Sequence, residues 1–467
     1  MSTDRPYVAG VDSSTQACKV LIVDPDTGAV VRQGRAAHID ATECDPEIWW
    51  QAFLSAVDDA GGLDDVAALS VGGQQHGMVC LDAAGQVIRP ALLWNDTRSA
   101  QAAHDLTLEA GDGDEAAGAK RWAEATGSVP VASLTVTKLR WLADHEPDNA
   151  ARLAAVCLPH DWLTWKIAGA SSLDRLVTDR SDASGTGYMA RVGREKPEQG
   201  EYRRDILARA LRIDESVAER IALPKILAPF ESAGCGNAAR GWEGIKLGPG
   251  CGDNAGAALG VGLSPGQAML SLGTSGVVAA VSDHSVVDPS GLVTGFADAT
   301  GRWLPLACTL NASRIIDAMA RVIGVGYDEF SRLALSVPDA GGLVLTPYFE
   351  GERTPNLPDA SASLTGMRLS NCDPAHIARA SVEGLLTLMR GALDAVRDAG
   401  VRVERIQLVG GGAQLEAIQR LAPSLLDMEV EAPETGEYVA LGAARQAAEV
   451  LNNAERQRQV LKIRNHK

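Results

Sequence analysis

Two stretches of the chain share one pattern of apolar and polar positions. Residues 7–24 are mostly apolar apart from a short polar turn at Ser14-Thr15-Gln16. Residues 268–281 repeat the arrangement around Gly273-Thr274-Ser275. Short apolar runs on either side of a turn are typical of β-hairpins. We therefore expect two hairpins, each with small hydroxyl-bearing residues in its turn.

Helix-start signals occur in both halves of the chain. Asp45-Pro46-Glu47 predicts an N-cap followed by a helix, and Asp373-Pro374 repeats the signal before apolar residues at helical spacing. Strands that alternate with such helices indicate an α/β fold. No firm elements are predicted for residues 195–244, which are charged and poorly periodic.

The length of the chain indicates two lobes. Its 467 residues with 46% hydrophobic content exceed one ordinary domain. Glycine and proline cluster at Gly248-Pro249-Gly250, a typical position for a boundary. We predict an N-terminal lobe over residues 1–248 and a C-terminal lobe over 249–467, with one hairpin in each.

Charge and cysteine usage exclude several classes of protein. A net charge of −17 leaves no basic excess for a nucleic-acid backbone. The eight cysteines are dispersed, never as Cys-x-x-Cys, which favours reduced thiols in a cytoplasmic protein. We see no signal peptide and no run of 18 apolar residues, so no membrane partner is expected.

The two hairpin turns are candidates for a phosphate clamp. Asp12 ends a predicted buried strand, where its carboxylate could reach Mg²⁺, while the amides and hydroxyls that follow could meet phosphate oxygens. A simple hairpin tip is the alternative for each turn, and the presence of both favours the clamp. We assign to the nucleotide Asp12, Ser14, Thr15, Gln16 and Lys19 from the first hairpin, and Gly273 and Thr274 from the second.

A run of three glycines follows a predicted strand. Gly410-Gly411-Gly412 comes directly before a predicted helix, so adenosine or phosphate could lie against bare backbone there. We therefore add Gly411, Gly412 and Gln414 to the nucleotide site. This is not a Walker loop, because no Gly-Lys-Ser/Thr follows.

Asp253 is the candidate general base. It stands immediately before a small-residue segment predicted to be helical. The structural alternative is an ordinary N-cap, worth about 1 kcal/mol. The functional alternative is that its carboxylate accepts the proton of an attacking hydroxyl during phosphoryl transfer.

Polar and aromatic residues of the first half could bind a polyhydroxylated substrate. Gln75 and His76, and later Trp94 and Asn95, gather donors, acceptors and an aromatic face at the ends of apolar segments. The structural alternatives are a turn histidine and a core tryptophan. The clustering of these residues favours a substrate site modestly.

Taken together, these motifs resemble the FGGY family of carbohydrate kinases over nearly the whole chain. The matching segments, in the order of the family, are 73–77, 94–96, 181–186, 252–254, 271–276, 351–355 and 410–413. The resemblance implies an α/β fold of two actin/hexokinase-like (ribonuclease H-like) lobes with the active site in a cleft between them. It also implies ATP and Mg²⁺ as cofactors, Asp253 as the base, and Gln75, His76 and Asn254 at the sugar.

The implied reaction is ATP-dependent phosphorylation of D-xylulose to D-xylulose 5-phosphate. We assign Asp12 and Asp253 to the metal. Other polyols or ketoses (ribulose, glycerol, fuculose), an actin-like ATPase and an inactive sugar-binding homologue remain alternative hypotheses. A homodimer is kept among the partner hypotheses, with the tail over 452–467 either frayed or used for subunit contact.

Overall fold

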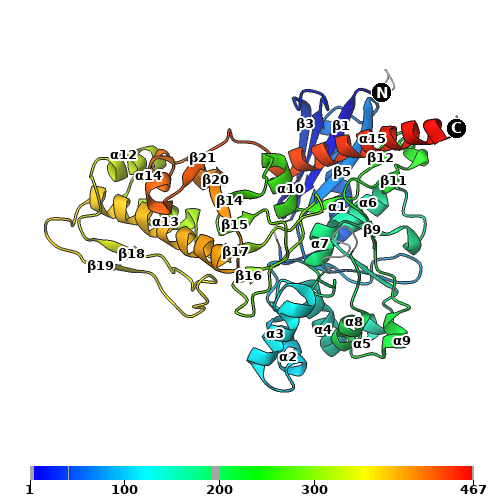
Figure 1. The fold of residues 1–467 in the computed structure, drawn as a ribbon, viewed down its shortest axis with the longest axis horizontal. Coiled ribbons are helices and arrows are strands. Elements are labelled where there is room, and N and C mark those ends of the chain that lie inside the picture. Colours follow the sequence, from blue (N-terminus) through cyan, green and yellow to red (C-terminus); the bar gives the residue numbers. More distant parts are fainter. Residues whose placement is uncertain (1–4, 40, 192–199, 465–467) are drawn as a thin grey trace. The chain divides into compact units, whose positions relative to one another are not determined.

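The computed structural model describes residues 5–39, 41–191 and 200–464, and the chain forms two compact units (Figure 1). Unit 1 comprises Met1–Gly262, Phe296–Arg302 and Glu437–Lys467. Unit 2 comprises Leu263–Gly295 and Trp303–Gly436. The compact units therefore differ from the predicted division at residue 248, because both the segment after Gly248 and the last helix belong to unit 1.

A mixed sheet forms the centre of unit 1. Its strand order is β11-β12-β5-β1-β2-β3, with β13 also paired to β5. The predicted first hairpin is confirmed, since β1 and β2 pair antiparallel with Asp12 opposite Lys19. β1 also pairs in parallel with β5. The bounds are β1 Tyr7–Ser13, β2 Ala17–Val23, β3 Val30–Ala37, β5 Val66–Gly73, β11 Gly234–Cys235, β12 Lys246–Leu247 and β13 Cys251–Gly252.

Helices cover both faces of this sheet, because apolar side chains point to both faces along its strands. Val8 and Leu21 pack with Ala440 and Ala444 of α15 (Tyr438–Arg464). The intervening residues of the same strands belong to the core that includes α1 (Pro46–Asp59). Because successive side chains of a strand point to opposite faces, each strand contributes to two apolar layers.

The helix that carries Asp253 lies against α15. This helix, α10 (Asp253–Val261), meets α15 through glycines, and both are seen beside the sheet in Figure 1. A Cβ placed on Gly442 would lie 1.9 Å from the Gly256 carbonyl oxygen. The two backbones are therefore in direct contact, which only glycine permits.

The remaining elements of unit 1 surround the sheet. The expected helix after Asp45 is confirmed, because the Asp45 carboxylate accepts a hydrogen bond from the Glu47 amide and caps α1. Elements also form at 200–244, where none was predicted. The other bounds are β4 Glu43–Cys44, β6 Val79–Leu81, β7 Ala91–Leu92, β8 Ala155–Cys157, β9 Val177–Thr178, β10 Lys225–Ile226, α2 Ala100–Ala110, α3 Glu115–Thr126, α4 Thr135–His145, α5 Pro147–Ala151, α6 Pro159–Ile167, α7 Arg180–Ser184, α8 Arg204–Leu211 and α9 Glu215–Ala218.

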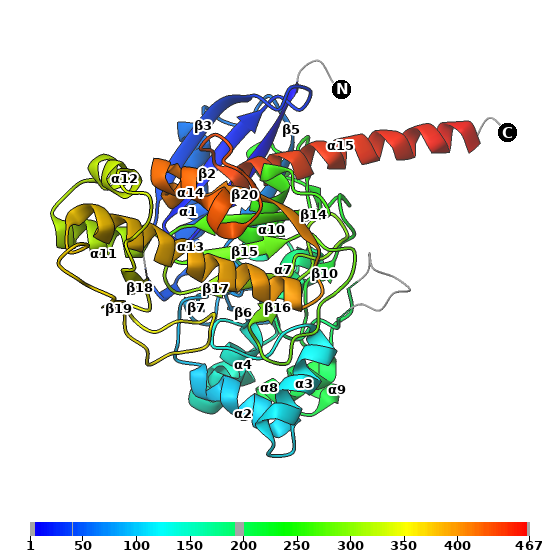
Figure 2. The ribbon, with the colours of Figure 1, turned by 60° about the vertical axis from the view of Figure 1, so that its left-hand side comes forward.

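Unit 2 is built on a second mixed sheet with strand order β16-β17-β15-β14-β20-β21. Its hairpin β14–β15 pairs Leu272 with Gly276 and confirms the second predicted hairpin. Helix α13 lies across this sheet (Figure 2) and begins after Asp373, as expected. The bounds are β14 Gly266–Leu272, β15 Gly276–Ala280, β16 Val293–Thr294, β17 Leu306–Thr309, β18 Val344–Thr346, β19 Ser363–Thr365, β20 Val403–Val409, β21 Glu429–Glu431, α11 Ser313–Ile323, α12 Tyr327–Leu335, α13 Pro374–Asp398 and α14 Glu416–Leu426.

Three further expectations concern membrane segments, the C-terminal tail and the cysteines. Within the described ranges, no helix is long and apolar enough to cross a membrane. The side chains of α15 from Ala454 onward lie outside the described part, and with them most of the tail hypothesis for 452–467. All eight cysteines are free thiols, in agreement with the expected absence of disulfides.

Candidate active site

The first hairpin presents a buried carboxylate next to a lysine. Asp12, at the end of β1, is 3% exposed, and its Oδ2 lies 3.3 Å from Lys19 Nζ. Lys19 also contacts Glu437 at 2.6 Å. Burial raises the pKa of Asp12 to about 6, against the opposing effect of Lys19. A cation at this position would therefore be favourable.

The turn of this hairpin touches one of the predicted sugar-binding residues. Trp94 Nε1 donates to Thr15 Oγ1 at 3.0 Å, so the two predicted sets of residues meet here. Trp94 is 43% exposed, which excludes the core position that we kept as its structural alternative. Asn95 donates to the Ala41 carbonyl at 3.4 Å. Ser14 and Gln16 lie in the same turn.

Asp253 is the first residue of α10, and Gly252 is the N-cap. The N-cap alternative for Asp253 is therefore wrong. Asp253 Oδ1 accepts hydrogen bonds from the Asn254 backbone amide at 2.7 Å and from Asn254 Nδ2 at 3.0 Å. Asn254 Nδ2 also donates to Gln75 Oε1 at 2.9 Å. Three predicted residues thus form one connected cluster.

The environment of Asp253 suits a general base. Its half-buried position raises the pKa of the carboxyl to about 7, with the Asn254 amide opposing and the charges of Asp12 and Asp182 adding to the rise. A base is most effective when its pKa lies near the operating pH. Asp253 can therefore both accept and release a proton near neutral pH.

His76 has an unusual backbone conformation. Its φ is 67°, in the left-handed region that is uncommon for a residue with a side chain. Its Nδ1 lies 2.7 Å from the Gly185 carbonyl oxygen, and its ring packs 5.5 Å from that of Phe296. The ring orientation is thus fixed from two sides.

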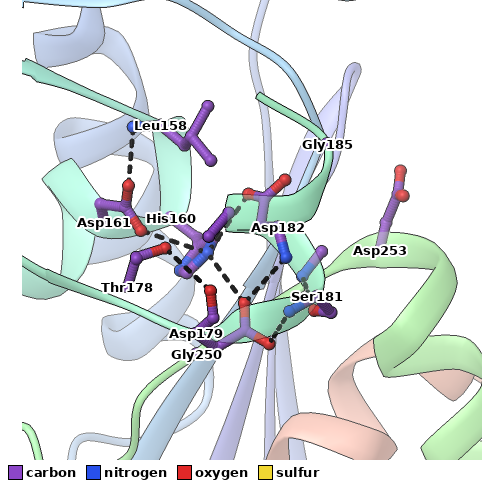
Figure 3. A network of polar contacts seen from close by, with 12 residues as sticks. Leu158, His160, Asp161, Thr178, Asp179, Ser181, Asp182, Gly185, Gly250 and Asp253 are labelled. Carbon is purple, nitrogen blue, oxygen red and sulfur yellow. Dashed lines mark hydrogen bonds and ion pairs between the residues drawn. The ribbon is translucent and has the colours of Figure 1, made fainter. Parts of the chain in front are cut away.

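Sequence reasoning missed a buried cluster around His160. His160 is fully buried, and its Nε2 lies 3.2 Å from Asp182 Oδ2 and 3.3 Å from Asp161 Oδ1 (Figure 3). Its distance to Asp179 Oδ1 is 3.7 Å. Burial alone would lower the pKa of His160, but the three carboxylates raise it to about 9. The available signal was a His-Asp pair inside the apolar stretch 153–167.

Unit 2 contains a cavity of about 710 Å³, lined by the remaining predicted nucleotide residues. This volume lies in the range of small-molecule sites. Backbone bonds from Ser313 to Gly273 and from Ala312 to Thr274 fix the hairpin turn at its edge. The predicted residues that line it are Gly273, Thr274, Gly411, Gly412 and Gln414.

The glycine run forms part of this cavity by the expected route of strand, turn and helix. Gly410 has a φ of 93°, and residues Gly411–Gln414 make a single 3-10 turn before α14 begins at Glu416. A Cβ on Gly412 would lie 2.3 Å from Ser313 Oγ, so no side chain fits there. Tyr327 and Asp317, joined by a 2.6 Å hydrogen bond, also line the cavity and were not predicted.

The residues present fit a magnesium ion at Asp12. Asp12 Oδ1 is buried and has no hydrogen-bond partner among the described residues. Nowhere in the described ranges do three or more His, Cys, Asp or Glu gather as a metal site. Mg²⁺ is commonly held by one or two carboxylates together with substrate phosphates and water. An ion that arrives with a nucleotide suits such an incomplete set of ligands.

Family models and curated relatives match nearly the whole chain. Residues 7–260 match the model of the N-terminal domain of the FGGY family of carbohydrate kinases, and residues 268–449 match that of its C-terminal domain. A xylulose kinase from Streptomyces coelicolor is 44% identical over 463 residues, which cover 97% of this chain and 90% of the relative. One from Streptomyces rubiginosus is 42% identical with the same coverage.

Solved structures agree. The crystal structure of xylulose kinase from Bifidobacterium adolescentis has a TM-score of 0.89 and 50% identity, with 96% of this chain and 93% of that chain covered. Glycerol kinase from Plasmodium falciparum, solved with ADP, shares the fold with a TM-score of 0.82 at 18% identity over 95% of this chain and 89% of that chain. The expected α/β fold of two actin/hexokinase-like lobes is confirmed.

Proposed function

The chain belongs to the FGGY family of carbohydrate kinases, and on this premise we propose that it transfers the γ-phosphoryl group of ATP to D-xylulose. The product would be D-xylulose 5-phosphate. The observation that carries the choice of sugar is the 50% identity over 96% of the chain to a solved xylulose kinase. Carbohydrate kinase activity and ATP use follow from the family itself.

The chemistry of the proposed reaction is assigned to residues of unit 1. Asp253 accepts the proton of the attacking sugar hydroxyl, while its Oδ1 stays anchored by Asn254. Gln75, His76 and Asn254 orient the sugar by hydrogen bonds. Mg²⁺, held by Asp12 and near Asp253, would neutralise the charge of the phosphates.

Nucleotide binding is assigned to the hairpin turns and the cavity of unit 2. Lys19 and the turn of Ser14, Thr15 and Gln16 would contact the terminal phosphates, as would Gly273 and Thr274. Gly411, Gly412 and Gln414 would lie along the adenosine, where the bare backbone allows close approach. Trp94, which donates to Thr15, and the adjacent Asn95 would complete the sugar site.

The decisive test combines a substrate panel with one variant. We expect ADP release in the presence of MgATP to require a sugar, and D-xylulose to exceed ribulose, glycerol and fuculose in kcat/KM. Asp253→Asn should lower kcat at least about 100-fold, since a general base contributes that much, with ATP affinity unchanged by calorimetry. ADP release without sugar would favour an ATPase, and full turnover by the variant would contradict the role of Asp253.

A further inference from the structure

A short helix, α7, contacts the candidate site at one backbone amide and at one side chain. Ser181 Oγ, on α7, accepts a hydrogen bond of 3.1 Å from the amide of Gly252. One residue beyond the end of the same helix, the Gly185 carbonyl lies 2.7 Å from His76 Nδ1. Gly252 is the residue before Asp253, so α7 contacts the backbone of the base and the ring of a sugar-binding candidate.

The contact with His76 fixes the protonation of its ring. A carbonyl oxygen only accepts, so Nδ1 must carry the hydrogen. In a neutral imidazole the other nitrogen, Nε2, is then unprotonated and acts as an acceptor. The ring is thereby prepared to accept a hydrogen bond from a sugar hydroxyl, and its orientation depends on where α7 holds Gly185.

This helix needs an external anchor. It has five residues, and helices so short are not stable alone. The Asp179 carboxylate caps it by accepting from the amides of Ser181 at 2.8 Å and Asp182 at 3.0 Å. His160 then lies between the charges of Asp179 and Asp182, as Figure 3 shows. The His160 cluster therefore holds the cap and the first turn of α7 together.

The cost of this cluster indicates a role in orientation. Burying charged groups is expensive, and replacing a buried ion cluster by apolar side chains is often neutral or stabilising. His160, Asp179 and Asp182 are nonetheless all at most 3% exposed. The Asp182 carboxylate also faces the Gln75 amide and the His76 N–H. The cluster therefore contacts Gln75 and His76, two of the residues proposed to bind the sugar.

We propose that α7 is a positioning element for phosphoryl transfer, in which Ser181 fixes the backbone at Asp253 and the Gly185 carbonyl fixes the His76 ring. His160 acts through Asp179 and Asp182 as the anchor of this helix. None of these supporting residues needs to touch the sugar. The inference rests on the proposed function, because it assigns Asp253 and His76 to the reaction.

Two buried serines on α7 provide a matched pair of variants. Ser181 and Ser184 are 1% and 4% exposed, and each accepts a hydrogen bond from a backbone amide. The donor to Ser184 is the amide of Ala297, at 2.9 Å, the residue after Phe296 and not the residue before Asp253. Each variant therefore removes an acceptor of a backbone amide, and only Ser181→Ala involves the base. Ser184→Ala also removes the 2.7 Å hydrogen bond from Ser184 Oγ to the Ser181 carbonyl.

Steady-state kinetics on D-xylulose and thermal unfolding should be measured for both variants. We expect Ser181→Ala to lower kcat about tenfold or more, because a displaced base transfers protons poorly, with KM for ATP unchanged. Ser184→Ala should lower Tm by about as much as Ser181→Ala does, and should keep kcat within about twofold of the wild type. Equal kcat values for the two variants would overturn the positioning role of Ser181.

A third variant tests the contact between the Gly185 carbonyl and the His76 ring. A Cβ on Gly185 would lie 2.6 Å from His76 Cε1, so Gly185→Ala must displace the ring. We expect KM for the sugar to rise about tenfold while KM for ATP stays constant. An unchanged KM for the sugar would overturn the proposal that Gly185 positions the His76 ring. A wild-type protein that releases no ADP with any sugar would instead contradict the proposed function, and the positioning role with it.

Discussion

At the scale of single residues, two aspartates of unit 1 have carboxyl pKa values well above those of exposed acids. The values are about 6 for Asp12 and about 7 for Asp253, chiefly because burial disfavours their charged forms. An acid with a raised pKa stabilises the folded state only while it is protonated. The stability that it contributes is complete below its unfolded pKa and is lost as pH rises through its folded pKa.

Because this contribution to stability falls as pH rises, it gives a prediction for the protein without metal or nucleotide. Asp253→Asn should gain about 2 to 3 kcal/mol of unfolding free energy relative to wild type between pH 5 and pH 8, because only the wild type must ionise a half-buried carboxyl. Urea unfolding with a chelator present measures it. Asp58→Asn, on the exposed side of α1, is the control. A difference for Asp253→Asn that does not change with pH would contradict the raised pKa.

Adjacent glycines of the unit 2 cavity give a second prediction. A methyl group on Gly412 would meet Ser313 Oγ at 2.3 Å, whereas one on Gly411 would meet nothing within 4 Å. Gly412→Ala should therefore lower unfolding stability by about 1 to 3 kcal/mol. Gly411→Ala should leave Tm unchanged and raise KM for ATP about tenfold, since its methyl occupies space proposed for the nucleotide. An unchanged KM for Gly411→Ala would place adenosine elsewhere.

At the scale of elements, the contact of α10 with α15 depends on glycine. A Cβ on Gly442 would lie 1.9 Å from the Gly256 carbonyl oxygen, and a backbone atom cannot move aside cheaply. We expect Gly442→Ala to cost about 3 kcal/mol or more and to reduce activity, because α10 begins with Asp253. Gly391→Ala in the middle of α13, where nothing lies within 4 Å, should instead gain about 0.5 to 1 kcal/mol. Equal stability of the two variants would exclude a tight contact.

Elements with local signals were predictable from the sequence, and elements defined by distant contacts were not. The hairpins and the helices after Asp45 and Asp373 depend on turns and caps within a few residues. Within the cluster of Gln75, Asp253 and Asn254, the first two were found because each stands beside small turn residues. Asn254 was assigned only through the resemblance to the FGGY family. His160 was missed because its partners Asp179 and Asp182 lie about twenty residues away, and nothing local indicates that they are paired.

At the scale of the whole molecule, the last helix is part of the first unit. Ala440, Ala444 and Ala447 of α15 cover Val8 and Leu21 of the unit 1 sheet. Gln446 is also buried there and bonds both ways with the Gly250 backbone. The boundary predicted at residue 248 rested on local glycines and proline, which mark a turn. Local composition around residue 248 cannot indicate that a helix near residue 440 packs on the sheet of unit 1.

A chain that ends at Gly436 should therefore lose unit 1 before unit 2. Eight of the nine tryptophans lie in unit 1 and only Trp303 lies in unit 2, so tryptophan fluorescence reports almost entirely on unit 1. We expect the truncated chain to show a fluorescence midpoint in urea well below that of the full chain, while circular dichroism retains a later transition. A single midpoint equal to that of the full chain would contradict the role of α15.

The place of α15 also sets the order in which the protein matures on the ribosome. Domains usually fold as they emerge, the N-terminal one first. Here every residue of unit 2 has been synthesised by Gly436, whereas unit 1 still awaits Glu437–Lys467. The first unit to be started is thus the last to be finished. The helix that carries Asp253 gains its partner only after α15 has been synthesised, so a nascent chain cannot hold Asp253 in its final position before α15 emerges.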